Sequence, residues 1–152
     1  MNKTYFQTNE TNDLQLLYEL NEHEHWFDSI QPTKEKSQID AIAKHKNRRF
    51  GIELKRRYVQ LKTYKTIMIE DYKLASMMLE WTINKLEPLY ICFLHDAVLI
   101  FNLLKLKSMP KLRIQDIKSV GYEKMQYQER RYLLDITDAV IYNYPCKTKT
   151  FS

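Results

Sequence analysis

Asp40, Glu53 and Lys55 are the residues of this sequence whose types and spacing are best suited to chemistry. Glu53 and Lys55 lie in a run that, from Phe50 onward, alternates apolar residues with charged or small ones. This alternation is the period of a half-buried strand, so the acid and the lysine share the face opposite Phe50. Two carboxylates that hold Mg²⁺ or Mn²⁺ beside a lysine suit phosphodiester hydrolysis, because the ion polarises the phosphate and the lysine orients water or stabilises developing charge.

A tight hairpin would bring the two acids together. If Lys46 and Asn47 form a two-residue loop, His45 pairs with Arg48 and every further pair follows from that register. Asp40 then lies directly opposite Glu53, where two carboxylates repel each other unless a cation lies between them. The same register places three apolar pairs together on the buried face: Ile39 with Leu54, Ala41 with Ile52, and Ala43 with Phe50.

Asp40 followed by Glu53-Leu54-Lys55 on the next strand resembles the PD-(D/E)XK nuclease superfamily, which includes type II restriction enzymes and archaeal Holliday junction resolvases. Ile39 stands where that family's name-giving proline would be. The resemblance covers about residues 10–107. It implies an α-β-β-β-α-β core whose acids and lysine form a metal-dependent DNA-cleaving site.

The resemblance also implies helpers from two helices. In that family the first helix often supplies one more carboxylate, for which Glu10 is the first choice and Glu24 the reserve, and a later helix supplies a lysine or glutamine, here Lys73. The alternative interpretations are a first-turn acid favoured by the helix dipole for Glu10 and a surface lysine with a buried stem for Lys73.

The acid-x-lysine spacing is common in a chain with 28% charged residues, and it recurs at Asp71-Tyr-Lys73 and Asp116-Ile-Lys118. Only the copy at Glu53 combines strand alternation, an upstream acid in pairing register and a following helix. A surface hairpin with solvated charges is the structural alternative to a catalytic one.

The charge balance favours a polyanionic partner. The chain carries 24 Lys and Arg against 19 Asp and Glu, a formal net charge of +5, although an imbalance of this size is also compatible with an ordinary solvated surface. Basic residues cluster around the hairpin and after it, and such a cluster predicts salt-sensitive DNA binding. The predicted DNA-contacting residues are Arg48, Arg49, Arg56, Arg57, Lys62 and Lys65.

The remaining patterns predict a single α/β domain over residues 1–152, with three layers and a central mixed sheet flanked by helices. One helix is expected to end near Glu24, another to run to about Lys85 with Leu74, Met77, Met78 and Trp81 as its apolar stripe, and two central strands to span 89–95 and 97–104. Residues 108–152 form a C-terminal extension in which 114–117 is a short helix or strand and 133–144 an edge strand.

Several classes are disfavoured. With two glycines in the chain, a phosphate-cradling glycine loop is not expected. Cys92 and Cys146 lack ligand-like spacing and are expected to be free thiols in a reducing cytoplasm. No apolar stretch is long enough to span a bilayer, and the polar opening residues lead us to expect no signal peptide.

The resulting hypothesis is a cytoplasmic, Mg²⁺- or Mn²⁺-dependent DNA endonuclease, structure-selective or weakly sequence-specific. A homodimer would, by analogy with that family, let two sites cut two strands. Two alternatives stay open: a non-catalytic nucleic-acid-binding module on the same fold, and a small phage-type protein-interaction or inhibitor domain. The 11 tyrosines would serve such an interface or stack on bases.

Overall fold

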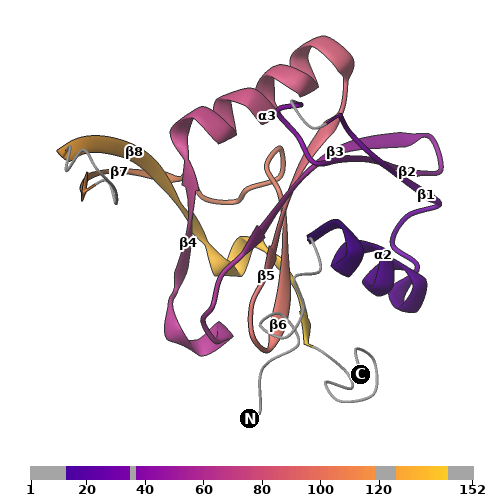
Figure 1. The fold of residues 1–152 in the computed structure, drawn as a ribbon, viewed down its shortest axis with the longest axis horizontal. Helices are drawn as coiled ribbons and strands as arrows, with labels where there is room; N and C mark the ends of the chain where they lie inside the picture. The colour runs from indigo at the N-terminus through magenta and orange to yellow at the C-terminus, as the bar shows by residue number, and fades with distance from the viewer. Residues whose placement is uncertain (1–12, 35–36, 119–125, 144–152) are drawn as a thin grey trace.

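The computed structural model describes residues 13–34, 37–118 and 126–143, with side chains described in these ranges except at 115–118 and 126–128. Its main feature is a mixed six-stranded sheet with the order β1-β2-β3-β5-β6-β9 (Figure 1). Only the central pair β3–β5 is parallel, and every other neighbouring pair is antiparallel. The strands span Ser29–Pro32 (β1), Ala41–His45 (β2), Arg48–Arg56 (β3), Glu87–Phe93 (β5), Ala97–Asn102 (β6) and Val140–Asn143 (β9).

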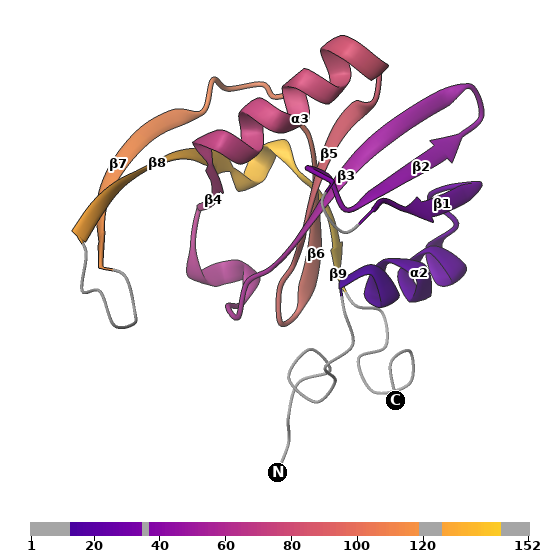
Figure 2. The same cartoon turned by 45° about the horizontal axis from the view of Figure 1, so that its top comes forward.

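One helix covers each face of this sheet (Figure 2). Helix α2 (Asp13–Glu24) buries Leu16, Leu17 and Leu20 against one face, and α3 (Asp71–Asn84) buries Met77 against the other. Helices on both faces of a mixed sheet confirm the predicted three-layer α/β fold. The predicted ends of both helices, near Glu24 and Lys85, are also confirmed.

The predicted hairpin forms with the predicted loop. His45 pairs with Arg48, and the register continues to the pair Ala41–Ile52. Lys46 adopts a left-handed backbone with φ of 55°, and its N–H donates to the Asp28 carboxylate at 2.6 Å. Turn geometry and the apolar alternation therefore agree on one register, as the sequence suggested.

Beyond Ala41 the predicted register is wrong. The Asp40 N–H donates to the Ile52 carbonyl at 2.8 Å, although Ile52 is the register partner of Ala41, and β2 begins only at Ala41. A displacement of one residue reverses the face that a side chain takes. Ile39 accordingly packs in the core on the α3 side of the sheet, whereas Leu54, its predicted partner, packs on the α2 side.

Strand β3 is more deeply buried than a half-buried strand. Its central residues are buried on both faces, including Gly51 and Glu53. A Cβ at Gly51 would lie 3.2 Å from both Ile39 Cδ1 and Leu86 Cβ, so this glycine admits a close neighbour. The sequence alone is compatible with either a nucleic-acid strand or a packed helix beside this glycine. In the structure, its neighbours are core residues of the protein itself.

The two strongly apolar runs after α3 form the neighbouring strands β5 and β6, which pair antiparallel. Residues 88–93 and 97–99 are all buried, because β5 is central and both faces of the sheet are covered here. The prediction of two central strands is confirmed.

A second sheet of three strands was not predicted. Its order is β4-β8-β7, formed by Thr66–Glu70 (β4), Gln126–Asp135 (β8) and Lys111–Lys118 (β7). β4 leads directly into α3, and β7 with β8 forms a ribbon that extends away from the six-stranded sheet (Figure 2). Short 3-10 helices span Leu61–Thr63 (η1) and Ile136–Asp138 (η2). The single edge strand predicted over 133–144 is wrong, because η2 separates the end of β8 from β9, and of these two strands only β9 is an edge strand of the six-stranded sheet.

Within the described part of the chain, neither helix has the length and apolar character required to cross a bilayer.

Candidate active site

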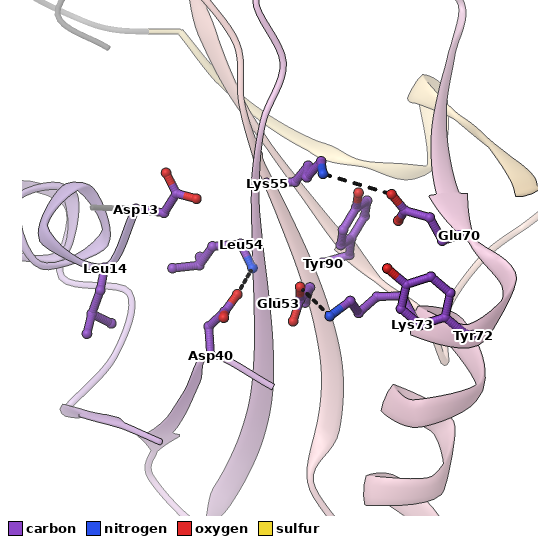
Figure 3. Close-up of a pocket in the computed structure, with 10 residues that line it drawn as sticks. All are labelled: Asp13, Leu14, Asp40, Glu53, Leu54, Lys55, Glu70, Tyr72, Lys73 and Tyr90. Atoms are coloured by element: carbon purple, nitrogen blue, oxygen red, sulfur yellow. Dashed lines mark hydrogen bonds and ion pairs between the residues drawn. The ribbon is translucent and has the colours of Figure 1, made fainter. Parts of the chain in front are cut away.

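A pocket of about 400 Å³ lies where β3, β5, the β4–α3 junction and the start of α2 meet (Figure 3). It contains Asp40, Glu53, Lys55 and Lys73, four of the five residues predicted to bind metal or catalyse. The fifth, Glu10, lies outside the described residues. The complete lining is Asp13, Leu14, Asp40, Glu53, Leu54, Lys55, Glu70, Tyr72, Lys73 and Tyr90.

Glu53 is the buried acid of this pocket. Its side chain is 10% exposed, and its Oε1 accepts from Lys73 Nζ at 3.0 Å. Burial, and then the nearby charge of Asp40, raise the pKa of Glu53 to about 7, while Lys73 partly counteracts this rise. A proton shared with Asp40 also favours the neutral form. When both acids are ionised, the buried Oε2 of Glu53 has no hydrogen-bond donor among the described residues.

Lys73 reaches Glu53 from the first turn of α3. Figure 3 shows its ammonium group facing the Glu53 carboxylate from the opposite wall of the pocket. Burial by itself would lower the pKa of Lys73, but the hydrogen bond and charge of Glu53 outweigh burial and raise this pKa. The lysine predicted from the later helix thus lies in the site, and it remains charged there.

Asp40 is held by the backbone of β3 rather than by strand pairing. Its Oδ2 accepts the Leu54 N–H at 2.8 Å. This bond takes up a strand N–H that a regular ladder would pair with a carbonyl, and Figure 3 shows the carboxylate pointing at that N–H. The residue itself is exposed, so one acid of the pair is open to solvent and the other is buried.

Lys55 follows Glu53 on the same face of β3 and has a side chain 41% exposed. Its Nζ lies 3.9 Å from Glu70 Oε1, a loose ion pair beyond hydrogen-bond distance. The lysine therefore points into the pocket, as predicted, and is held less tightly than Lys73.

The sequence patterns missed the four other polar residues of the pocket: Asp13, Glu70, Tyr72 and Tyr90. Glu70 is the last residue of β4, a strand that the sequence patterns do not predict. Asp13, an acid in the first turn of α2, pairs with Arg56, one of the predicted DNA-contacting residues. Tyr90 donates to the Met68 carbonyl at 3.3 Å, and burial raises its pKa, so it stays protonated.

The pocket has an excess of negative charge. Four carboxylates line it, against two lysine ammonium groups, although the whole chain is basic. Within the described residues, no group of three acidic, histidine or cysteine side chains is arranged to hold a metal. The acceptor Oε2 of Glu53 without a donor, beside a second carboxylate, nevertheless fits a divalent cation, which prefers oxygen ligands and keeps several waters.

The predicted DNA-contacting residues do not form one patch. Arg48 and Arg49 lie at the hairpin end of β3, roughly 26 Å along the strand from Arg56 at the other end. Arg48 binds Glu87 through two bonds of 2.7 and 2.9 Å, and Arg49 reaches the Asn84 carbonyl at 3.5 Å.

At the other end of β3, Arg57 donates to the Met68 carbonyl at 2.7 Å and so links β3 to β4. Lys62 and Lys65 are exposed in the β3–β4 connection. The basic residues nearest the pocket are therefore those that follow β3, and those at the hairpin are distant from it.

No protein-family model matches the chain, and no curated protein matches it. Among solved structures, it is similar to Hjc, a Holliday junction resolvase from the archaeal hyperthermophile Archaeoglobus fulgidus, with a TM-score of 0.52 and 14% sequence identity. The alignment covers 84% of this chain and 93% of the resolvase. The likeness concerns the course of the backbone, and on that basis the chain has the restriction endonuclease-like α/β fold.

Proposed function

We propose that this chain is a metal-dependent DNA endonuclease, structure-selective or weakly sequence-specific, whose active site is the pocket around Glu53. The observation that carries the proposal is the buried Glu53 carboxylate, which faces a second acid and has one oxygen without a donor among the described residues. A carboxylate in this state has a strongly raised pKa, a common property of functional sites. The pocket occurs on a fold shared with a Holliday junction resolvase.

Asp40 and Glu53 are the residues that would hold Mg²⁺ or Mn²⁺, with Glu10 as a further candidate outside the described residues. Such an ion, when bound, would polarise the scissile phosphate and lower the pKa of a bound water. The Leu54 N–H fixes the Asp40 carboxylate, which keeps the two acids together before any ion arrives.

The two lysines have different roles in this proposal. Lys73 favours the ionised form of Glu53, since its charge and hydrogen bond lower the pKa of that carboxyl. Lys55 is more exposed and only loosely paired, so it can approach the attacking water or the phosphate and stabilise charge that develops there. Lys55 is accordingly the proposed catalytic lysine, and Lys73 a positioning residue.

The test is cleavage of supercoiled, linear, single-stranded and four-way branched DNA with Mg²⁺ or Mn²⁺, by wild type and by Asp40→Asn and Lys55→Ala. Lys107→Ala, an exposed lysine outside the pocket lining, is the matched control for loss of a positive charge. We expect cleavage by wild type and Lys107→Ala only. Equal cleavage by wild type and Lys55→Ala would refute the assigned site.

A second function is favoured by one observation. Lys73 already supplies a positive charge 3.0 Å from Glu53, as it would in a module that keeps the fold without binding a metal. Such a module would bind the same DNA molecules without cutting them under any metal condition. A protein-interaction domain would do neither.

A further inference from the structure

A second cleft, of about 330 Å³, lies between the end of β3 and the second sheet. Its lining includes two tyrosines from the β3–β4 connection, and we call it the tyrosine cleft. The residues that matter here are Arg57, Tyr58, Tyr64, Thr66, Met68 and Arg113.

The tyrosine cleft and the catalytic pocket share their two walls. On β3 and its continuation, Lys55 lines the pocket and Arg57, two positions on, lines the cleft. On β4, Glu70 lines the pocket and Met68 lines the cleft. Residues two apart on a strand point the same way and are roughly 6.6 Å apart, so the cleft lies next to the pocket along both strands. The Arg57 bond to the Met68 carbonyl joins the two walls.

The pocket and the neighbouring cleft differ in charge. The pocket has four carboxylates, whereas the described lining of the cleft has Arg57 and Arg113 and no carboxylate. The connection at residues 57–65 also carries Lys62 and Lys65, both exposed, and contains no acid. An anionic chain with its reacting group in the pocket would therefore meet positive charge as it continues into the cleft.

The tyrosines add a preference for unpaired bases, which positive charge alone does not give. Tyr58 and Tyr64 are 60% and 58% exposed, unusually open for large aromatic side chains in the same cleft. Exposed aromatic rings beside basic residues are the means by which proteins bind single-stranded nucleic acid, because bases stack on the rings. In an intact duplex, the faces of the bases are already stacked on one another and cannot do so.

From this arrangement we propose that the tyrosine cleft binds unpaired nucleotides of DNA, next to a phosphate held in the catalytic pocket. The preferred substrates are then DNA molecules with single-stranded or splayed arms, in preference to continuous duplex. This inference rests on the proposed function for the substrate's chemistry, but the binding step itself needs neither metal nor cleavage.

The first test is fluorescence anisotropy in EDTA, with single-stranded, splayed-arm and fully paired DNA of equal length. Wild type is expected to bind the first two more tightly than the duplex. Tyr64→Ala and Tyr58→Ala should each weaken this binding about tenfold, as expected for loss of one stacked base. Tyr64→Phe should retain it, since the ring remains, and Ile83→Ala, exposed near the end of α3, should not change it.

The second test uses wild-type protein only, so it does not depend on variants that fold. Splayed-arm DNA with 5-iodouracil in its unpaired arm is irradiated in EDTA, and the cross-linked peptide is identified by mass spectrometry. Attachment at Tyr58 or Tyr64 supports the proposal. Equal affinity for duplex and splayed DNA, or cross-links only elsewhere, would overturn it. Ring-dependent binding without any cleavage would leave this inference standing and refute the proposed nuclease.

Discussion

Replacing Glu53 by glutamine should stabilise the protein at alkaline pH. Below the ordinary pKa of 4.5, Glu53 is protonated in both the folded and unfolded states, so its ionisation does not change the free energy of unfolding. Between 4.5 and about 7 the unfolded chain releases the proton and the folded protein retains it, so the free energy of unfolding falls as pH rises. Above about 7 the cost is complete, and it amounts to about 3 kcal/mol because one pKa unit corresponds to about 1.4 kcal/mol.

Glutamine resembles the protonated acid and does not titrate. Urea unfolding should therefore show Glu53→Gln more stable than wild type by up to about 3 kcal/mol at pH 8, and by less than about 1 kcal/mol at pH 5. The same variant should be inactive as a nuclease, so stability and the proposed activity would change in opposite directions.

The matched control is Glu87→Gln, because the pKa of Glu87 is lowered in the folded protein whereas that of Glu53 is raised. The hydrogen bond from Arg48 lowers the pKa of Glu87, so the ionised carboxylate contributes stability above pH 4.5, and this is lost as pH falls through the lowered value. Glu87→Gln should be less stable than wild type at pH 8. A Glu53→Gln variant less stable than wild type at pH 8, or a difference that does not change between pH 5 and pH 8, would refute the account of the buried acid.

Three further predictions concern stability and reactivity. Gly51→Ala should lower the free energy of unfolding by about 1 kcal/mol in a urea titration, because the new methyl would lie 3.2 Å from Leu86 Cβ; an unchanged midpoint would mean that the core can move there. Lys46→Gly should raise the free energy of unfolding by about 0.5 to 1 kcal/mol by relieving the left-handed backbone, and a lower midpoint would contradict this. In a Cys146→Ser variant, Cys92 should react with a thiol reagent only after unfolding, since it is buried and burial raises its pKa; rapid labelling of the native protein would exclude that burial.

The hairpin shows which parts of the site the sequence could predict. Its loop and its register up to Ala41 follow from local rules, namely turn length and the alternation of apolar residues. The change of register at Asp40 does not follow from these rules, because there the Asp40 carboxylate accepts the Leu54 N–H in place of a strand carbonyl. The two acids still meet in one pocket, through a side-chain contact in place of the predicted pairing.

The walls of the pocket show what local rules could not reach. The family resemblance predicts Lys73 through its helix, but Glu70 lies on a strand whose partner within the described residues is β8, more than 50 residues away in the sequence. Asp13 likewise enters the pocket through the packing of α2 and its pair with Arg56. Residues that meet only through such long-range contacts leave no periodic pattern in the sequence.

The pairing of β4 with β8 also sets the order in which the protein can be completed during synthesis. Glu70 lies opposite Arg131, and β8 is the only strand that pairs with β4 in the described part of the chain. During synthesis, Asp40, Glu53 and Lys73 therefore leave the ribosome long before β8, the partner strand of β4. A product that ends before residue 126 would contain every residue that lines the pocket but not the strand that pairs with β4.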